Sequence, residues 1–182
     1  MKLIRRWSLM RNIQEENIQE HSMETAVFAH ALAEIGNAYF QESYDANYAA
    51  VLALYHDVGE VIIGDLPTPV KYFNPQIKQA YGEIEDVAKH KLLSFLPGEL
   101  QEAYRPLFFA DRQRPEYRLV KAADKLSAYV KCLEECAAGN GEFLRAKESV
   151  FQGLAKYQDI PAVQWFMDHC LDAYSKTLDE LD

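Results

Sequence analysis

A histidine and an aspartate stand next to each other, His56-Asp57, inside the largely apolar stretch NYAAVLALYHDVGEVII. An imidazole beside a carboxylate is costly to bury unless a partner compensates both groups, and a metal ion is one such partner. Glu60 follows His56 by four positions, which places both on one face of a predicted helix. Its carboxylate could act as a general base on a water beside the ion. The dipeptide alone favours the alternative, a hydrogen-bonded His-Asp pair with a solvated glutamate.

His21 is a second candidate ligand, at the start of a helix predicted over residues 17–35. His30 lies further along, about 180° around that helix, so the two histidines are not expected to hold one ion together. His30 also falls on the apolar stripe formed by Met23, Val27 and Ala31. That position predicts a core or partner-facing histidine.

Asp124 is a third candidate, a carboxylate within the segment RLVKAADKLSAYV. Its position is equally compatible with an ion pair to a neighbouring lysine, Lys121 or Lys125, and with a ligand role. Two imidazoles and two carboxylates from three predicted helices would suit one divalent ion that keeps open water positions. Cobalt, manganese, zinc and magnesium all accept this donor set. The four proposed metal ligands are His21, His56, Asp57 and Asp124.

The elements that must position these residues are all predicted to be helical. Asn17 with Glu20 indicates a capping box, and Asn74 with Pro75 indicates a second helix start. The segment GDLPTPVKYF contains two prolines and is predicted to be a structured loop. Residues 98–114 are ambiguous, and no window alternates like a strand. We predict an all-α fold, a compact bundle of about six or seven helices in a single domain over residues 1–182, with helices over 17–35, 47–63, 74–95, 115–138 and 142–157 and one beginning near 159–161.

Composition and charge exclude several classes of function. The formal net charge is −9, which gives no general attraction to a nucleic-acid polymer or to anionic lipid. No apolar run has the length of a membrane span or a signal peptide. Three cysteines cannot all pair within one chain, which favours a reducing cytoplasm. Cys132 and Cys136 lack further ligands nearby and are interpreted as core thiols.

The order H…HD…D formed by His21, His56-Asp57 and Asp124 resembles the signature of the HD-domain superfamily of metal-dependent phosphohydrolases, which are helical. Four strings, RRWSLMRN, ENIQEHS, LYHDVGEVIIGDLPTPVKYFN and YVKCLEECAAGN, are similar to the bacterial 5′-deoxynucleotidase subfamily. The resemblance covers most of the chain and fades beyond about Tyr157. It implies an HD-domain helical bundle, a homodimer, and hydrolysis of deoxyribonucleoside 5′-monophosphates.

The same resemblance implies roles for particular residues. The four proposed ligands would hold one divalent ion, with Glu60 assisting the attacking water. Arg6 would orient the phosphate and Trp7 would pack against the sugar and disfavour a 2′-hydroxyl. The turn from Asp65 to Thr68 would contact the nucleoside. The implied substrate-binding residues are Arg6, Trp7, His21, Asp57, Asp65, Leu66, Pro67, Thr68 and Asp124.

Two other functions remain open from the sequence. One is an HD-type hydrolase of a nucleoside triphosphate or a signalling nucleotide, which would share the metal ligands. The other is a noncatalytic nucleotide-binding protein that keeps the metal centre for stability, against which the presence of Glu60 argues. Judged without the resemblance, Arg5, Arg6 and Arg11 favour a solvated basic segment, and Trp7 an anchor that ties the N-terminus to the core.

Overall fold

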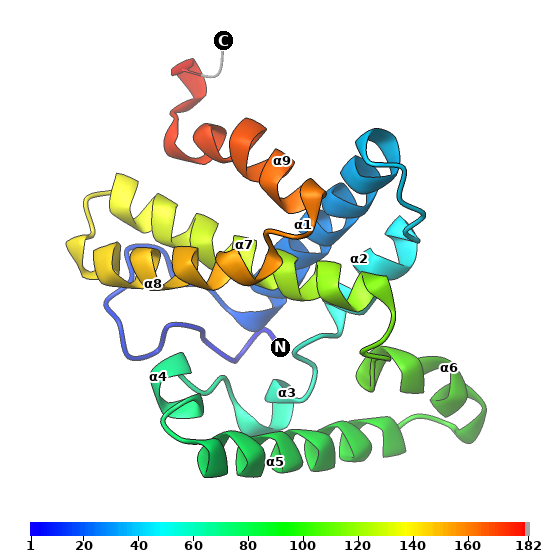
Figure 1. The fold of residues 1–182 in the computed structure, drawn as a ribbon. Coiled ribbons are helices and arrows are strands. Elements are labelled where there is room, and N and C mark those ends of the chain that lie inside the picture. Colours follow the sequence, from blue (N-terminus) through cyan, green and yellow to red (C-terminus); the bar gives the residue numbers. More distant parts are fainter. Residues whose placement is uncertain (181–182) are drawn as a thin grey trace.

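The computed structural model describes residues 1–180 and is helical, with no named strand in this range. Helices α1, α2 and α7 pack together, with α8 and α9 against them, while α5 lies apart on the other side with α3, α4 and α6 (Figure 1). The predicted all-α class is thus confirmed. The helices are α1 (Ile18–Tyr39), α2 (Ala46–Leu54), α3 (Glu60–Ile63), α4 (Thr68–Lys71), α5 (Pro75–Ser94), α6 (Gly98–Phe108), α7 (Pro115–Ala137), α8 (Leu144–Leu154) and α9 (Pro161–His169).

Helix α1 begins as predicted, because the Asn17 side chain accepts from the N–H of Glu20 and the Glu20 side chain accepts from the N–H of Asn17. The face predicted to be buried is wrong. Met23 and Val27 are 59% and 54% exposed, and His30 is exposed beside them. The buried face instead carries His21 and a series of small residues that let α2 and α7 approach closely, namely Ser22, Thr25, Ala26, Ala29 and Ala33.

The helix predicted over residues 47–63 is interrupted. Helix α2 ends at Leu54, residues 55–59 form a turn, and the one-turn helix α3 follows. His56 and Asp57 therefore lie in a turn between two helices. In a continuous helix adjacent side chains would diverge by about 100°, whereas the turn directs both toward one point. Gly59 suits this turn, because a Cβ there would meet Glu85 Cγ of α5 at 2.9 Å.

The second half of the chain follows its start and stop signals closely. Asn74 caps α5, α7 covers 115–137, and the 142–157 prediction matches α8 with short 3₁₀ turns at both ends. The ambiguous segment 98–114 contains α6. The nine α-helical segments among residues 1–180 exceed the predicted six or seven, since the 47–63 helix is divided and the proline-containing loop includes the four-residue α4.

No described helix combines the length and apolarity needed to cross a bilayer. The three cysteines, all within the described residues, are unpaired. Cys132 is fully buried, which agrees with its interpretation as a core thiol.

Candidate active site

The structure brings the four predicted metal ligands together from three elements. His21 comes from the first turn of α1, His56 and Asp57 from the turn after α2, and Asp124 from the middle of α7. One ligand atom each of His21, His56 and Asp124 lie within 4.8 Å of one another, a grouping that could hold a metal ion. Asp57 Oδ2 is 3.1 Å from His56 Nε2 and 3.7 Å from His21 Nε2, so it faces the same point.

The two imidazoles present the same nitrogen to this point. His21 Nδ1 lies 2.9 Å from Ser127 Oγ, and His56 Nδ1 lies 2.6 Å from the carbonyl oxygen of Ala53. A carbonyl oxygen can only accept, so His56 carries its proton on Nδ1 when neutral. Both Nε2 atoms are buried and have no hydrogen-bond partner in the described part of the chain. A metal ion could bind the lone pairs of these two nitrogens together with the neighbouring carboxylates.

Charges around the cluster favour a cation at its centre. Burial raises the pKa of Asp57, but His56 and His21 outweigh it and hold that pKa well below its usual range. Burial likewise raises the pKa of Asp124, but the nearby His21, Lys125 and His56 outweigh burial and hold that pKa well below its ordinary value. Burial and the nearby Arg6 guanidinium lower the pKa of His21. Burial lowers the pKa of His56, but Asp57 and Asp124 outweigh burial and raise it. A metal ion at this point would compete with the His56 proton, because histidine ligands must be neutral and carboxylate ligands ionised.

The neighbours of Asp124 include both a proposed metal ligand and the two lysines considered as its ion-pair partners. His21 Nε2 is 3.2 Å from Asp124 Oδ1, while in the described chain no lysine nitrogen lies within 4 Å of this carboxylate. Lys121 still interacts with it electrostatically. Burial lowers the pKa of Lys121, but Asp124 and Asp57 outweigh burial and raise that pKa above its ordinary value. The aspartate thus faces the cluster, with a lysine cation nearby.

Glu60 starts α3 and is 5% exposed, with Oε2 buried and unpartnered in the described residues. Burial, with the negative charges of Asp57 and Asp65, raises its pKa to about 9. A carboxyl with this pKa keeps its proton at neutral pH, so Glu60 could accept a proton there only if positive charge in the site lowered its pKa.

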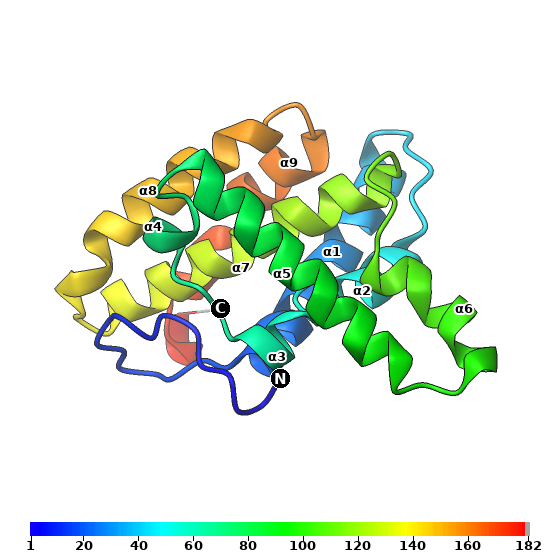
Figure 2. The ribbon, with the colours of Figure 1, turned by 90° about the horizontal axis from the view of Figure 1, so that it is seen from below.

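Arg6 and Trp7 lie on the segment before α1, which loops along α7 and α8 and returns to the start of α1 (Figures 1 and 2). The Arg6 side chain is only 13% exposed, so it is not a solvated basic residue. Arg5 and Arg11, in contrast, form exposed pairs with Glu15 and Glu142.

The charged neighbours of Arg6 include the cluster itself. Burial lowers its pKa, but Glu16, Asp124 and the other nearby carboxylates outweigh burial and raise it. The Trp7 ring packs on Phe143 at 5.2 Å between centroids, so it does anchor this segment. Trp7 as a whole is half-buried.

The predicted turn from Asp65 to Thr68 connects α3 to α4. Asp65, Leu66 and Pro67 are half-buried, and Thr68 is exposed. The Tyr81 hydroxyl of α5 donates to the carbonyl oxygen of Gly64 at 3.1 Å, which holds the start of this turn. Burial raises the pKa of Asp65, although Arg6 opposes this, so the turn and the N-terminal segment share one electrostatic environment.

Three residues that the sequence analysis did not assign to the site lie next to it. Ser127 contacts His21, Lys121 lies near the two aspartates, and Glu16 contacts both Arg6 and Trp7. Ser127 lies one turn after Asp124 on α7, and that spacing is the one signal that could have found it. Glu16 begins the string ENIQEHS, but its residue type and spacing do not indicate its contacts, which arise from the path of the N-terminal segment.

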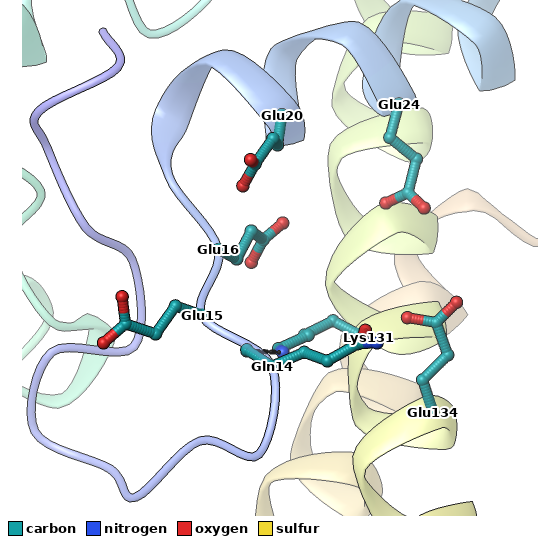
Figure 3. Close-up of a pocket in the computed structure, with 7 residues that line it drawn as sticks. All are labelled: Gln14, Glu15, Glu16, Glu20, Glu24, Lys131 and Glu134. Atoms are coloured by element: carbon teal, nitrogen blue, oxygen red, sulfur yellow. Dashed lines mark hydrogen bonds between the residues drawn. The ribbon is translucent and has the colours of Figure 1, made fainter.

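A cavity of about 390 Å³ adjoins the start of α1, and acidic residues line most of it (Figure 3). Ser127 donates to Glu24 at 2.5 Å on this side. Burial raises the pKa of Glu24 to about 7, although the Ser127 hydrogen bond opposes this. The lining residues are Gln14, Glu15, Glu16, Glu20, Glu24, Lys131 and Glu134.

Solved structures share the fold. An HD-domain phosphohydrolase from Listeria innocua matches with a TM-score of 0.83 at 23% identity, over 94% of this chain and 82% of that one. The HD phosphohydrolase of cyanophage S-2L, bound to dA and one catalytic Zn²⁺ ion, matches with a TM-score of 0.66 at 16% identity, over 93% and 91%. The helical fold of this chain is therefore the HD-domain fold.

Sequence comparison is more specific. A 5′-deoxynucleotidase of Shewanella oneidensis is 46% identical over 183 residues, covering 100% of this chain and 93% of that protein. One from Erwinia tasmaniensis is 48% identical over 182 residues, covering 100% and 91%. The family model described as 5′-deoxynucleotidase YfbR-like matches residues 1–174. The chain belongs to the YfbR-like 5′-deoxynucleotidase family.

Proposed function

We propose that the protein is a divalent-metal-dependent 5′-deoxynucleotidase that hydrolyses deoxyribonucleoside 5′-monophosphates to a deoxyribonucleoside and phosphate. The observation that carries this proposal is the pair of buried, unpartnered Nε2 atoms of His21 and His56 facing two ionised aspartates. Family membership supports the monophosphatase activity. The dA and Zn²⁺ bound by the cyanophage protein support a deoxynucleoside ligand and a metal at this fold's site.

His21, His56, Asp57 and Asp124 would hold the metal ion. A divalent ion at such a site supplies Lewis-acid activation of a water and neutralises charge on the phosphate. Cobalt, manganese, zinc and magnesium all suit the mixed imidazole and carboxylate donors.

Glu60 would take the proton from the attacking water. Its pKa of about 9 in the chain alone means that the carboxyl binds a proton tightly. Positive charge placed in the site lowers this pKa toward neutral pH, where a base acts best. The water oxygen would form a bond to phosphorus as the bond from phosphorus to the 5′ oxygen breaks, and the leaving 5′ oxygen would take a proton from solvent.

Arg6 and Lys121 would bind and stabilise the phosphoryl oxygens. The Arg6 guanidinium has one nitrogen on Glu16 and keeps its other N–H donors for oxygen atoms of a phosphate. Trp7 would form the wall against the deoxyribose, and a 2′-hydroxyl would be desolvated there without a partner. Asp65 would accept from the 3′-hydroxyl, with Leu66, Pro67 and Thr68 along the nucleoside.

The test is a panel of ribo and deoxy nucleoside mono-, di- and triphosphates, assayed with each of the four divalent ions after chelation. We expect phosphate release from the deoxy monophosphates alone and only with metal present. Cleavage of triphosphates instead would identify a different HD hydrolase. Binding without release of phosphate from any nucleotide would indicate a noncatalytic protein.

We also propose a cytoplasmic homodimer. The unpaired thiols support a reducing compartment. The exposed apolar residues Met23 and Val27 of α1 support a subunit interface. Light scattering of the purified protein would overturn the dimer by reporting the mass of one chain.

A further inference from the structure

Glu16 connects the two residues proposed to recognise phosphate and sugar. Its Oε1 accepts from Arg6 Nη1 at 3.2 Å, and its Oε2 accepts from Trp7 Nε1 at 3.0 Å. The Glu16 side chain is 11% exposed, so both bonds are largely shielded from water. We propose that Glu16 is a positioning residue that sets phosphate binding and deoxyribose selectivity together, an inference that rests on the proposed function.

Backbone contacts hold the segment that carries Arg6 alongside the segment that carries Glu16. The Arg6 N–H donates to the Glu16 carbonyl oxygen at 2.9 Å, and the Ile18 N–H donates to the Ile4 carbonyl oxygen at 3.0 Å. Arg5 and Asn17 form an antiparallel bridge between the same two segments. Residues 4–6 therefore lie alongside residues 16–18, immediately before His21. The carboxylate links the recognition segment to the start of the helix that carries a metal ligand.

Trp7 needs such support. Its backbone φ is 55°, in the left-handed region that a bulky residue seldom occupies without tertiary contacts. The Asn12 side chain donates to the Trp7 carbonyl oxygen and Phe143 packs against the ring. Among the hydrogen bonds of Trp7 within residues 1–180, the one to Glu16 alone is made by the indole N–H, so this bond restricts rotation of the ring.

The charge of Glu16 is also matched to Arg6. Glu16 is the first among the carboxylates that raise the Arg6 pKa, ahead of Asp124 and Asp57. A guanidinium held this way on one side presents its remaining donors in a fixed direction, which is how bidentate phosphate recognition gains specificity. Figure 3 shows Glu16 beside Glu20 at the cavity, whereas Glu15 extends away from them.

Glu16→Gln replaces one of the two acceptor oxygens of Glu16 and keeps the size and shape of the side chain. An amide has one acceptor oxygen, and its NH₂ group would oppose either the Arg6 or the Trp7 donor. We expect kcat/KM for a deoxynucleoside monophosphate to fall by about tenfold or more, and the preference over the ribonucleotide to fall with it. Glu15→Gln is the matched control, because Glu15 is 66% exposed and its ion pair is with the exposed Arg5.

Trp7→Phe tests whether Glu16 affects selectivity through its hydrogen bond with the Trp7 indole. Phenylalanine keeps an aromatic ring at position 7 but has no indole N–H. In the double variant the glutamine NH₂ group therefore meets no competing donor on that side, and its oxygen can accept from Arg6. The selectivity losses of the two substitutions should therefore be non-additive, with the double variant close to Trp7→Phe alone. Additive losses, or a Glu16→Gln enzyme with unchanged selectivity, would overturn the positioning role.

Fluorescence gives a readout that does not need activity. Trp7 and Trp165 are the two tryptophans, so Trp165→Phe leaves Trp7 as the reporter. We expect acrylamide to quench Trp7 more strongly in Glu16→Gln than in Glu15→Gln. Unchanged quenching would contradict the inference, even if the parent enzyme hydrolysed no deoxynucleotide. Increased quenching in a protein without that activity would reject the proposed function and leave the Glu16 contact supported.

Discussion

At the scale of single residues, the candidate metal site depends on which nitrogen each imidazole presents. Two histidines use Nδ1 for a contact with the protein and direct Nε2 inward. For His56 the partner is a backbone carbonyl, which a side-chain substitution cannot remove. For His21 it is Ser127, whose hydroxyl donates to Glu24 and is thereby left to accept from Nδ1. A substitution of Ser127 can therefore change which nitrogen of His21 carries the proton.

Ser127→Ala should weaken metal binding. Loss of such a contact to a metal-binding histidine typically reduces metal affinity about 10–100-fold. Calorimetric titration with zinc or cobalt measures it. Ser22→Ala is a matched control, since Ser22 is also buried next to His21 but its hydroxyl has no hydrogen-bond partner among the described residues. Equal affinities for the two variants would contradict a role for Ser127.

Glu60→Gln should separate catalysis from metal binding. The amide keeps the shape of Glu60 but accepts no proton, so kcat should fall by about 10²- to 10⁴-fold. Metal content, measured by mass spectrometry, should match the parent enzyme, because Glu60 is not one of the four proposed ligands. Nearly full turnover in this variant would reject Glu60 as the base.

At the scale of elements, the segment before α1 is held in place by α7. Glu135 is 2% exposed and accepts from the N–H groups of Ile13 and Gln14, from the Lys131 ammonium and from the Asn140 amide. Burial alone would raise the pKa of Glu135, but these hydrogen bonds lower it to about 2. One carboxylate thus fixes the loop that carries Arg6 and Trp7.

Glu135→Gln should destabilise the fold and raise KM. Since donors would be left unpaired in a buried site, we expect the free energy of unfolding to fall by about 2 kcal/mol. Denaturant titration measures this fall. The exposed neighbour Glu134→Gln should change the unfolding free energy by less than about 0.5 kcal/mol.

Glu135→Gln should also change how the free energy of unfolding depends on pH. A lowered folded-state pKa stabilises the protein above the ordinary value of 4.5, and this contribution disappears as the pH falls toward 2. The parent protein should therefore lose more stability than Glu135→Gln across this interval. Parallel curves for the two proteins would show that the lowered pKa of Glu135 is not the cause.

At the scale of the whole molecule, the proposed ligands join three separate parts of the chain: α1, the turn after α2, and α7. A ligand that binds only the folded state stabilises it by mass action. Gly59 contributes at the same scale, because its missing side chain lets α5 lie against the turn that carries His56 and Asp57.

Metal should raise the melting temperature. At a concentration 100 times its dissociation constant, the ion should contribute about 2.7 kcal/mol, or roughly 5–10 °C for a chain of this size. Chelation should reverse the shift. Asp124→Asn should show little of it, while Asp86→Asn, an exposed position on α5, should show all of it. An equal shift in both variants would place the metal elsewhere.

Local sequence signals predicted the helix boundaries and the candidate ligands of this protein. Asn17 with Glu20, Asn74 with Pro75, and Gly139 each mark a helix boundary that the structure has within a residue or two, because capping depends on a few neighbouring groups. The four proposed ligands were also found from residue types and order. Periodicity chose the wrong face of α1, since small residues between closely packed helices carry a weaker hydrophobic signal than exposed Met23 and Val27.

Only the tertiary structure decided how the site is built. The break between α2 and α3 turns His56 and Asp57 toward one point, and α5 stabilises that turn from outside the local sequence. Glu16, Ser127 and Glu135 act on residues that are up to 122 positions away in the chain. No local pattern encodes such contacts, because they follow from the packing of α1 against α7 and from the path of the N-terminal segment. Sequence therefore determined which groups could do the chemistry, and packing decided their direction, their protonation and their support.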